Sequence, residues 1–328
     1  SPYTLSLHDA LPIFMPFYEF DGAIMVTASH LPFNRNGFKF FTAEGGLNKA
    51  DIKEVLEYAA SAHILPFEYN AESVNLMQMY AAHLRSMIST GVGGDLSNMK
   101  IVVDAGNGAG GFFANNVLAP LGADISGSQF LDPDGTFPNH QPNPENKDAM
   151  ESICKQVRET GADLGIIFDT DVDRSAAVTS EGKPISRNVI VALAAAIGAD
   201  DYPGGTVVTD SITSNELHTF LEDKLGLKHL RYKRGYKNVI NKAIELSKEG
   251  ENAFLAIETS GHAAYSDNYY LDDGAFLAVQ IIINAANLKK ESKGIEHMIA
   301  TLAEPAESVE IRFNLTTDNF GEVGDKIL

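Results

Sequence analysis

The sequence of 328 residues predicts an α/β protein built from related domains. Short apolar runs rich in β-branched residues recur along the chain, and each run ends in a polar turn. Amphipathic patterns with helical spacing lie between these runs, and breaks in composition divide the chain into units of about 100 residues. Ligands of open α/β sheets gather at the carboxyl ends of strands, so the polar turns are where chemistry is expected.

Five apolar runs are expected to form strands. Their ranges are 23–26, 101–103, 165–168, 206–208 and 253–257. Asn48 is expected to cap a helix whose apolar face includes Leu56, and residues 213–216 match a capping box before a helix that ends at Gly226. Residues 189–197 predict a buried helix. A further apolar stripe has helical spacing, Val74, Met77, Leu84 and Met87, and its methionines are interpreted as core filling.

The charge balance argues against two classes of partner. The chain carries 44 acidic and 25 basic residues, a formal net charge of −19, which disfavours broad surfaces for nucleic acid or anionic membranes. A small phosphate ligand needs only a local cationic cluster and stays compatible with this charge. Because no apolar run is as long as a membrane span, neither nucleic acid nor a membrane is expected as a partner, and the oligomeric state is left open.

The single cysteine, Cys154, excludes an intrachain disulfide and suits core packing in a helical segment better than a reactive thiol. A reducing compartment is consistent with this, so we expect a cytoplasmic location, with an organelle stroma as the alternative. Residues 1–14 look foreign to the rest of the chain and resemble read-through of a vector or sequencing adaptor. They are therefore expected to be a non-native leader.

Two motifs carry candidate chemistry. Residues 26–32, Val-Thr-Ala-Ser-His-Leu-Pro, follow the first apolar run, so a turn can hold the Ser29 hydroxyl at a strand end, although a helix cap is the alternative for this serine. Residues 169–174, Asp-Thr-Asp-Val-Asp-Arg, follow another apolar run, and their carboxylates repel each other unless a cation or arginine compensates them. A reactive hydroxyl with a hard-cation site indicates phosphoryl transfer.

The acidic motif predicts a Mg²⁺ site at Asp169, Asp171 and Asp173. A calcium EF-hand is excluded because its loop needs glycine at the sixth and glutamate at the twelfth position, where this chain has Arg174 and Ser180. Mg²⁺ fits better because it uses few protein carboxylates and completes its shell with phosphate and water. A solvated acidic turn is the alternative.

A glycine-rich segment at residues 106–111 formally matches the dinucleotide pattern G-x-G-x-x-G. A lone match of this kind is weak evidence, and a structural turn is the favoured interpretation. No nucleotide cofactor is therefore expected.

In order and spacing, these motifs resemble the α-D-phosphohexomutase superfamily, which includes phosphoglucomutase, phosphomannomutase and phosphoglucosamine mutase. Residues 27–32 resemble its phosphoserine loop, 169–174 its metal loop, and 258–262, Glu-Thr-Ser-Gly-His, its sugar-binding loop. Residues 134–140 are also typical of family members, and the resemblance extends over residues 17–328. It implies tandem related three-layer α/β/α domains with mixed sheets.

The resemblance implies a reaction that moves phosphate between C1 and C6 of a hexose phosphate through a phosphoserine and a bisphosphorylated sugar. Ser29 would carry the phosphate, His30 would support its loop, and Lys39 would act as general acid or base. One Mg²⁺ would be held by the carboxylates of the metal loop and a phosphoserine oxygen of Ser29. A hexose 1,6-bisphosphate would serve as activator and intermediate.

The remaining roles concern the substrate. Arg174 would contact phosphate, and Arg234 and Gly235 lie in a loop that resembles the one helping to set sugar orientation. Sugar hydroxyls would be held by Glu258, Ser260 and His262. Without the resemblance, Lys39 could be a strand-edge lysine, Arg234 a surface residue and His262 a structural histidine.

The metal loop departs from the family pattern at two positions. Thr170 and Val172 stand where glycines are common, and they restrict the backbone angles of the loop. The carboxylates and the arginine remain.

The resemblance also implies a domain division. A truncated first domain with the phosphoserine loop would span 15–92, a second with the metal loop 95–186, and a third with the sugar-binding loop 187–303. Residues 304–328 would begin a truncated fourth domain. Because family members have more sequence at both ends, we expect a fragment with impaired activity.

Two other functions remain open at this point. A haloacid-dehalogenase-type phosphatase would use Asp169 as nucleophile, since Asp-x-Asp after a strand is its hallmark. A non-catalytic sugar-phosphate binding module would take up ligand and Mg²⁺ without phosphorylation of Ser29. The sequence leans toward the phosphomannomutase/phosphoglucomutase or phosphoglucosamine branches, but it does not fix the hexose phosphate.

Overall fold

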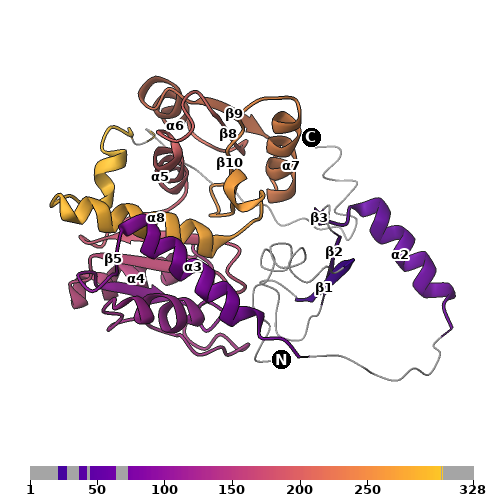
Figure 1. The fold of residues 1–328 in the computed structure, drawn as a ribbon, viewed down its shortest axis with the longest axis horizontal. Helices are drawn as coiled ribbons and strands as arrows, with labels where there is room; N and C mark the ends of the chain where they lie inside the picture. Colours follow the sequence, from indigo (N-terminus) through magenta and orange to yellow (C-terminus); the bar gives the residue numbers. More distant parts are fainter. Residues whose placement is uncertain (1–20, 28–36, 43–44, 64–72, 304, 306–328) are drawn as a thin grey trace, which may run out of the picture.

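The computed structural model describes residues 21–27, 37–42, 45–63, 73–303 and 305. Within them the chain forms three sheets, with strand orders β1-β2-β3, β4-β5-β6-β7 and β11-β10-β8-β9, and helices alternate with the strands (Figure 1). The second and third sheets contain parallel and antiparallel pairs, which confirms the predicted α/β fold with mixed sheets. All five predicted runs are strands.

The first sheet is antiparallel, and the predicted phosphoserine loop follows its first strand. Its strands are β1 (Gly22–Val26), β2 (Phe38–Thr42) and β3 (Gly45–Gly46). Val26 pairs with Phe38, and the Thr27 amide donates to the Gly37 carbonyl at 3.0 Å, so the two strands close the base of segment 28–36. Ser29 and His30 fall inside that segment and therefore lie outside the described residues.

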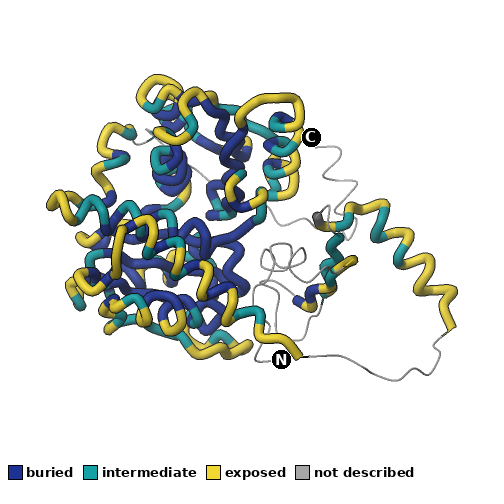
Figure 2. The backbone as a smooth tube through the Cα atoms, viewed as in Figure 1, coloured by how far each residue is buried: buried dark blue, intermediate teal, exposed yellow. Residues whose placement is uncertain are grey.

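Helix α2 (Lys49–Ser61) begins where the sequence predicts. The Asn48 side chain accepts from the backbone amides of Ala50 and Asp51, and the Asp51 carboxylate accepts from the Asn48 amide, which completes a capping box. Its apolar face is not packed into the core, because no residue of this helix is buried (Figure 2) and Leu56 is 64% exposed. Local signals therefore predicted the helix but not its packing.

The second sheet is covered on both faces. Its strands are β4 (Ile101–Asp104), β5 (Leu164–Phe168), β6 (Ser175–Thr179) and β7 (Pro184–Ile185). On one face α4 (Lys147–Thr160) packs Ile153 and the buried Cys154 against Val102 and Ile167. The other face packs against α3 (Leu76–Val92) and η1 (Phe113–Leu118), which is followed by η2 (Ala119–Leu121). The core position predicted for Cys154 is confirmed.

The third sheet has the same layered plan. Its strands are β8 (Thr206–Asp210), β9 (Lys228–Tyr232), β10 (Leu255–Ile257) and β11 (Ala263–Tyr265). One face carries α7 (Tyr236–Lys248). The other faces α5 (Asn188–Gly198), which is the predicted buried helix, together with α6 (Asn215–Thr219) and η3 (Phe220–Lys224).

The capping box predicted at residues 213–216 is wrong: the N-cap is the next residue, and its N3 position is Leu217, which cannot return a side-chain hydrogen bond. Ser214 is the N-cap of α6 and its hydroxyl accepts from the Leu217 amide at 3.1 Å. The Thr213 hydroxyl instead donates to the Asp210 carbonyl at 3.2 Å and accepts from Arg231 at 3.1 Å. A competing contact at the end of β8 therefore decides which hydroxyl caps the helix.

Helix α8 (Gly274–Lys290) joins the second and third sheets into one core. It follows the short helix η4 (Ser266–Asn268), precedes η5 (Ile295–Ile299), and contacts α3, α5 and β6 (Figure 1). A single hydrophobic cluster runs through both sheets along these helices. Helix α3 ends at Gly93, which is its left-handed C-cap.

The predicted stripe on α3 is only partly correct. Leu84 is fully buried, and Met77 and Met87 pack against the core as partly buried side chains. Val74 precedes the helix and is 49% exposed, so its predicted place in the helical stripe is wrong.

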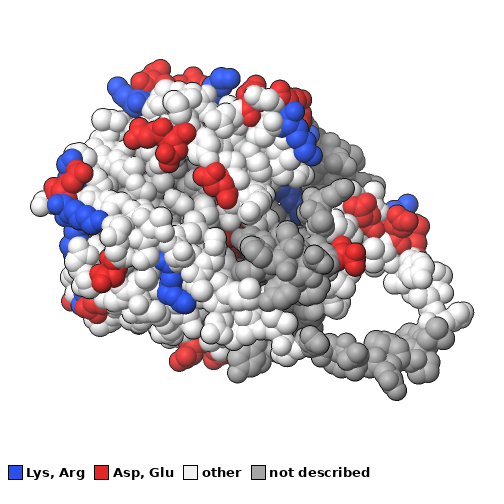
Figure 3. All heavy atoms as spheres, in the orientation of Figure 1, with Lys and Arg blue, Asp and Glu red and all other residues white. Residues whose placement is uncertain are grey.

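The surface agrees with the acidic composition. On the face drawn in Figure 3, acidic and basic side chains are interspersed. Among the described residues, no helix combines the length and apolar character that crossing a membrane requires.

A buried ion pair at the carboxyl end of β4 is expected to make stability pH-dependent. His140 Nε2 lies 3.0 Å from an Asp104 carboxylate oxygen and its Nδ1 3.0 Å from the Gln141 carbonyl, so both ring nitrogens face acceptors, which favours the protonated ring. Burial by itself lowers the pKa of His140, but the hydrogen bond and charge of Asp104 outweigh it and raise that pKa above 6.5.

This stabilisation is complete below the unfolded-state pKa and is lost as pH rises through the higher folded-state pKa. Urea unfolding should therefore show that His140→Gln costs about 1 kcal/mol more at about pH 6 than at about pH 9. The exposed His63, changed in the same way, provides the control. An equal cost of His140→Gln at both pH values would contradict the ion pair.

Candidate functional site

The predicted metal loop brings its carboxylates together inside the protein. Asp169, Asp171 and Asp173 follow β5, all of whose residues are buried, and their own exposed fractions are 0%, 3% and 4%. One oxygen from each carboxylate lies within 4.8 Å of the others. The solvated-turn alternative is therefore excluded, because the burial of the strand holds the loop out of water.

Arg174 compensates only part of this charge. Its Nη2 and Nε lie 3.0 and 3.1 Å from the same oxygen of Asp169, its backbone amide donates to the other oxygen at 3.1 Å, and its Nε lies 3.6 Å from Asp173. Burial, followed by the neighbouring carboxylates, raises the pKa of Asp169 well above its usual range and that of Asp173 to about 7. These buried oxygen donors suit a hard divalent cation.

The glycine-rich segment 106–111 supports the metal loop. The Ala109 amide donates to the Thr170 carbonyl at 2.8 Å. A Cβ atom at Gly108 would lie 2.6 Å from that same carbonyl oxygen, so only glycine permits the approach. This contact gives the segment a structural role, in agreement with the interpretation as a turn.

Val172 holds the metal loop in a conformation that its side chain disfavours. Its φ is +65°, which is unusual for a β-branched residue, and it is 3% exposed. Its carbonyl accepts from the Gly274 amide at 3.0 Å. The family glycine at this position would adopt the same backbone without strain.

We expect Val172→Gly to be more stable than Val172→Ala, although alanine is the more stable of the two replacements at most helix and strand positions. Both Val172→Gly and Val172→Ala lose the buried side chain, but only glycine relieves the positive φ, so the glycine variant should be about 1 kcal/mol more stable to urea. Val191 in α5 provides the matched control, since alanine there should be the more stable by about 1 kcal/mol. A more stable alanine variant at position 172 would argue against backbone strain.

The predicted sugar-binding loop lies directly beside the metal loop. It connects β10 with β11 and carries Glu258, Ser260 and His262. The backbones of Arg174 and His262 form an antiparallel bridge, and the Ser175 amide donates to the Gly261 carbonyl at 3.3 Å. The two loops, from different sheets, therefore share backbone hydrogen bonds.

The loop at residues 234–237 joins this site through two contacts. The Gly235 amide donates to a carboxylate oxygen of Glu258 at 2.6 Å. The Tyr236 ring stacks on His262 with centroids 5.0 Å apart and planes at 21°. Burial raises the pKa of Glu258, and the Gly235 amide and the charge of His262 oppose that shift. Arg234 is exposed at the start of the loop.

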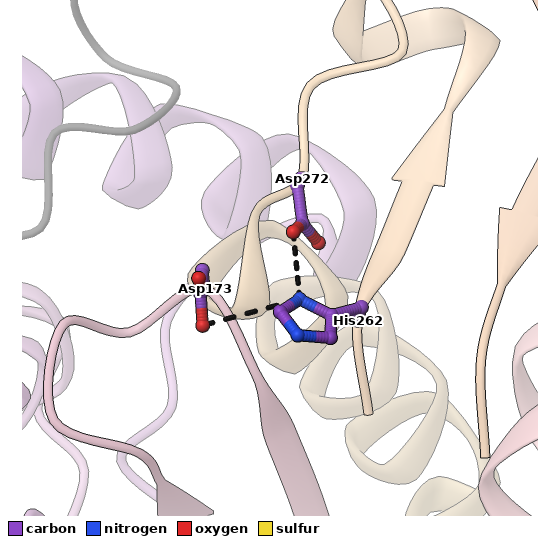
Figure 4. Close-up of side chains that lie close together, drawn as sticks. All are labelled: Asp173, His262 and Asp272. Carbon is purple, nitrogen blue, oxygen red and sulfur yellow. Dashed lines mark hydrogen bonds and ion pairs between the residues drawn. The ribbon is translucent and has the colours of Figure 1, made fainter. Parts of the chain in front are cut away.

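Two buried carboxylates were missed by the sequence interpretation. Asp210, at the end of β8, accepts from the Thr259 hydroxyl at 2.9 Å and so supports the sugar-binding loop. Asp272 lies 2.6 Å from His262 Nδ1, whose other neighbour is Asp173 at 3.9 Å (Figure 4). Asp210 had a signal, because it lies in the polar turn that follows the predicted strand 206–208. Asp272 had none, because only the fold brings it to His262.

Most of the predicted site residues are thus gathered in one place. The structure brings together Asp169, Asp171, Asp173, Arg174, Gly235, Glu258, Ser260 and His262. Lys39 lies on β2 opposite Met25 in the first sheet. Ser29 and His30 lie outside the described residues, so their distance from the carboxylates stays a prediction.

Comparison with known proteins agrees with this arrangement. The chain matches the models of phosphoglucomutase/phosphomannomutase α/β/α domain I over residues 6–63, domain II over 78–182 and domain III over 186–303. The second match begins inside α3. The metal loop falls in the domain II match and the sugar-binding loop in the domain III match.

Two similar proteins carry the names of different phosphohexose mutases. A phosphomannomutase/phosphoglucomutase of Pseudomonas syringae is 30% identical over 89% of this chain and 60% of its own length. A phosphoglucosamine mutase of Symbiobacterium thermophilum is also 30% identical, over 89% of this chain and 64% of its own length. The chain thus spans about 60% of the length of the first of these relatives.

A solved structure gives the same assignment. The crystal structure of a phosphoglucomutase/phosphomannomutase family protein from Burkholderia thailandensis superposes with a TM-score of 0.71 and 28% identity, covering 87% of this chain and 59% of that one. Three domain models of one family match in order, and the fold and the neighbouring acidic and sugar-binding loops agree with them. The chain therefore belongs to the phosphoglucomutase/phosphomannomutase family, within the α-D-phosphohexomutase superfamily.

Proposed function

We propose that this chain carries the catalytic site of a phosphohexomutase. Such an enzyme moves phosphate between C1 and C6 of a hexose phosphate through a phosphoserine and a bisphosphorylated sugar. The observation that supports this most is the backbone bridge between Arg174 and His262. It places a buried acidic site beside a loop of sugar-binding character, as transfer of a phosphoryl group to a sugar hydroxyl requires. The names of the relatives support the same reaction.

In this proposal, Asp169, Asp171 and Asp173 hold one Mg²⁺ together with an oxygen of phosphorylated Ser29. Their buried, mutually repelling carboxylates fit a hard cation. Bound Mg²⁺ would stabilise negative charge on the phosphoryl group during transfer. Arg174 contacts the phosphate, and an ion pair fixes its guanidinium, with Nη2 3.0 Å from a carboxylate oxygen of Asp169.

The sugar is held by polar contacts. Glu258, Ser260 and His262 bind its hydroxyls, and Arg234 and Gly235 help to set its orientation. The Ser260 hydroxyl oxygen is buried and has no hydrogen-bond partner among the described residues, which suits a group that awaits a ligand. Paired donors and acceptors select hydroxyls more strongly than apolar walls do.

Proton transfer and the phosphoserine loop complete the proposal. A sugar hydroxyl loses a proton as it attacks phosphorus, and Lys39 acts as the general acid or base for that step. Ser29 carries the phosphoryl group, and His30 supports its loop. A hexose 1,6-bisphosphate supplies phosphate to Ser29, and the buried lone Cys154 is in keeping with a cytoplasmic or stromal location.

The haloacid-dehalogenase alternative is disfavoured by the surroundings of Asp169. Both of its carboxylate oxygens accept hydrogen bonds from Arg174, and the side chain is fully buried. An aspartyl nucleophile needs one oxygen directed at the substrate.

The test is the first half of the reaction. The chain would be mixed with glucose, mannose or glucosamine 1,6-bisphosphate and Mg²⁺, and followed by ³¹P NMR. We expect a protein-bound phosphoserine and release of the hexose monophosphate. Binding without phosphorylation would identify a sugar-phosphate binding module instead, and aspartyl phosphate would identify the phosphatase.

A further inference from the structure

The segment Asp272-Asp273-Gly274, just before α8, is anchored to two distant parts of the chain. On one side, the Gly274 amide donates to the Val172 carbonyl of the metal loop at 3.0 Å. A Cβ atom at Gly274 would lie 2.6 Å from the carbonyl carbon of Arg174 and 2.8 Å from the Val172 oxygen, so no other residue allows this approach.

On the other side, Asp273 is anchored by buried hydrogen bonds. The Tyr80 hydroxyl of α3 lies 2.7 and 2.6 Å from its two oxygens, and the Phe276 amide donates to the carboxylate at 2.9 Å as the cap of α8. Asn268 adds a further bond at 3.1 Å. The backbone on which Asp272 sits is therefore held between the metal loop and the core.

Asp272 uses this fixed position to hold His262. Its carboxylate lies 2.6 Å from His262 Nδ1, the residue is 6% exposed, and its backbone bridges Ala264 in the strand that follows the sugar-binding loop. Figure 4 shows Asp272 and Asp173 approaching the same ring nitrogen of His262, Nδ1. Because Tyr236 stacks on the ring face, both the edge and the plane of the imidazole are fixed.

The chemistry of this contact determines where the ring proton lies. The Asp272 carboxylate accepts a hydrogen bond from Nδ1 of His262, so Nδ1 is the nitrogen that keeps its proton when the ring is neutral, and Nε2 then carries the lone pair. We propose that Asp272 is a positioning residue, which holds His262 in the Nδ1–H tautomer so that Nε2 is the ring atom presented to a sugar phosphate. The identity of that ligand rests on the proposed function, whereas the tautomer does not.

The tautomer can be measured directly in the full chain. With ¹⁵N-labelled histidine, long-range ¹H–¹⁵N spectra distinguish Nδ1–H from Nε2–H rings, and a His262→Gln spectrum assigns the signal. We expect the Nδ1–H pattern in the unchanged chain and a shift toward Nε2–H in Asp272→Ala. Asp272→Asn keeps the shape of the side chain and an acceptor oxygen, so its His262 signal should lie between those of the unchanged chain and Asp272→Ala. This variant also tests the proposal if Asp272→Ala does not fold.

The control is Asp267→Ala, which removes a nearby carboxylate that bonds Tyr202 at the surface and should leave the His262 signal unchanged. An Nε2–H pattern in the unchanged chain, or no change in either Asp272 variant, would overturn the proposal. Calorimetry with glucose 1,6-bisphosphate should show about tenfold weaker binding in Asp272→Ala. If the unchanged chain does not bind this ligand at all, the proposed function fails, while the spectra still decide the role of Asp272.

Discussion

Replacing Asp171 by asparagine should slow phosphoryl transfer from glucose 1,6-bisphosphate to Ser29 by about 10²–10³-fold. The change keeps the shape of the side chain but removes one of three buried carboxylates whose oxygens lie within 4.8 Å of each other. Mg²⁺ loses a charged ligand, so the concentration of Mg²⁺ needed for half-maximal rate should also rise. Both quantities can be measured by ³¹P NMR or a coupled assay over a Mg²⁺ titration.

The same substitution should stabilise the metal-free protein. Three neighbouring carboxylates repel each other in the absence of a cation, so removal of one should raise the metal-free unfolding free energy by about 1 kcal/mol. Mg²⁺ should then increase the melting temperature of the unchanged chain but not of Asp171→Asn. Asp201→Asn, at an exposed position after α5, is the control and should change neither stability nor Mg²⁺ response. A Mg²⁺ response unaffected by Asp171→Asn would place the cation elsewhere.

Replacing Ser29 by alanine should remove the protein-bound phosphate and reduce transfer by about 10³-fold or more, because no other group can take the place of the nucleophile. After incubation with glucose 1,6-bisphosphate, intact-mass analysis should show one phosphoryl group added to the unchanged chain and none added to Ser29→Ala. Mg²⁺ binding should weaken only modestly, since the three carboxylates remain. This distinguishes loss of the nucleophile from loss of the metal site.

Ser61→Ala is the matched control for the Ser29 prediction. Ser61 ends α2 in the same part of the chain, and its hydroxyl donates to the Tyr58 carbonyl at 3.0 Å, so its removal should leave phosphorylation unchanged. Phosphate retained on Ser29→Ala would show that another residue is the acceptor. Peptide mapping would then identify that residue and overturn the serine mechanism.

Features encoded by neighbouring residues were predictable from the sequence. The apolar run before Asp169 made both a buried strand and an acidic loop at its end predictable, and Asn48 marked the start of α2. In each case the physical cause is local, because strand burial and helix capping depend on residues a few positions apart. The carboxylates of the metal loop were identified for the same reason, whereas the residues of the sugar-binding loop were identified through the family resemblance.

Features that depend on long-range contacts were not predictable. Leu56 has the spacing of a buried residue and is exposed, and Thr213 was displaced as a cap by its contact with Asp210. The anchoring of Asp273 by Tyr80 joins residues 193 positions apart, and no local pattern indicates it. Core packing and competition between hydrogen-bond partners decide such contacts.

The sequence by itself determined which side chains could bind a cation and a sugar phosphate, because carboxylates, hydroxyls and imidazole carry their chemistry wherever they lie. Only the tertiary structure decided that the two loops share a backbone bridge at Arg174 and His262. It alone also placed Asp272 against the imidazole. The reason is that α8 and the common core bring strand ends from two sheets together, and their relative position is a property of the packed core as a whole.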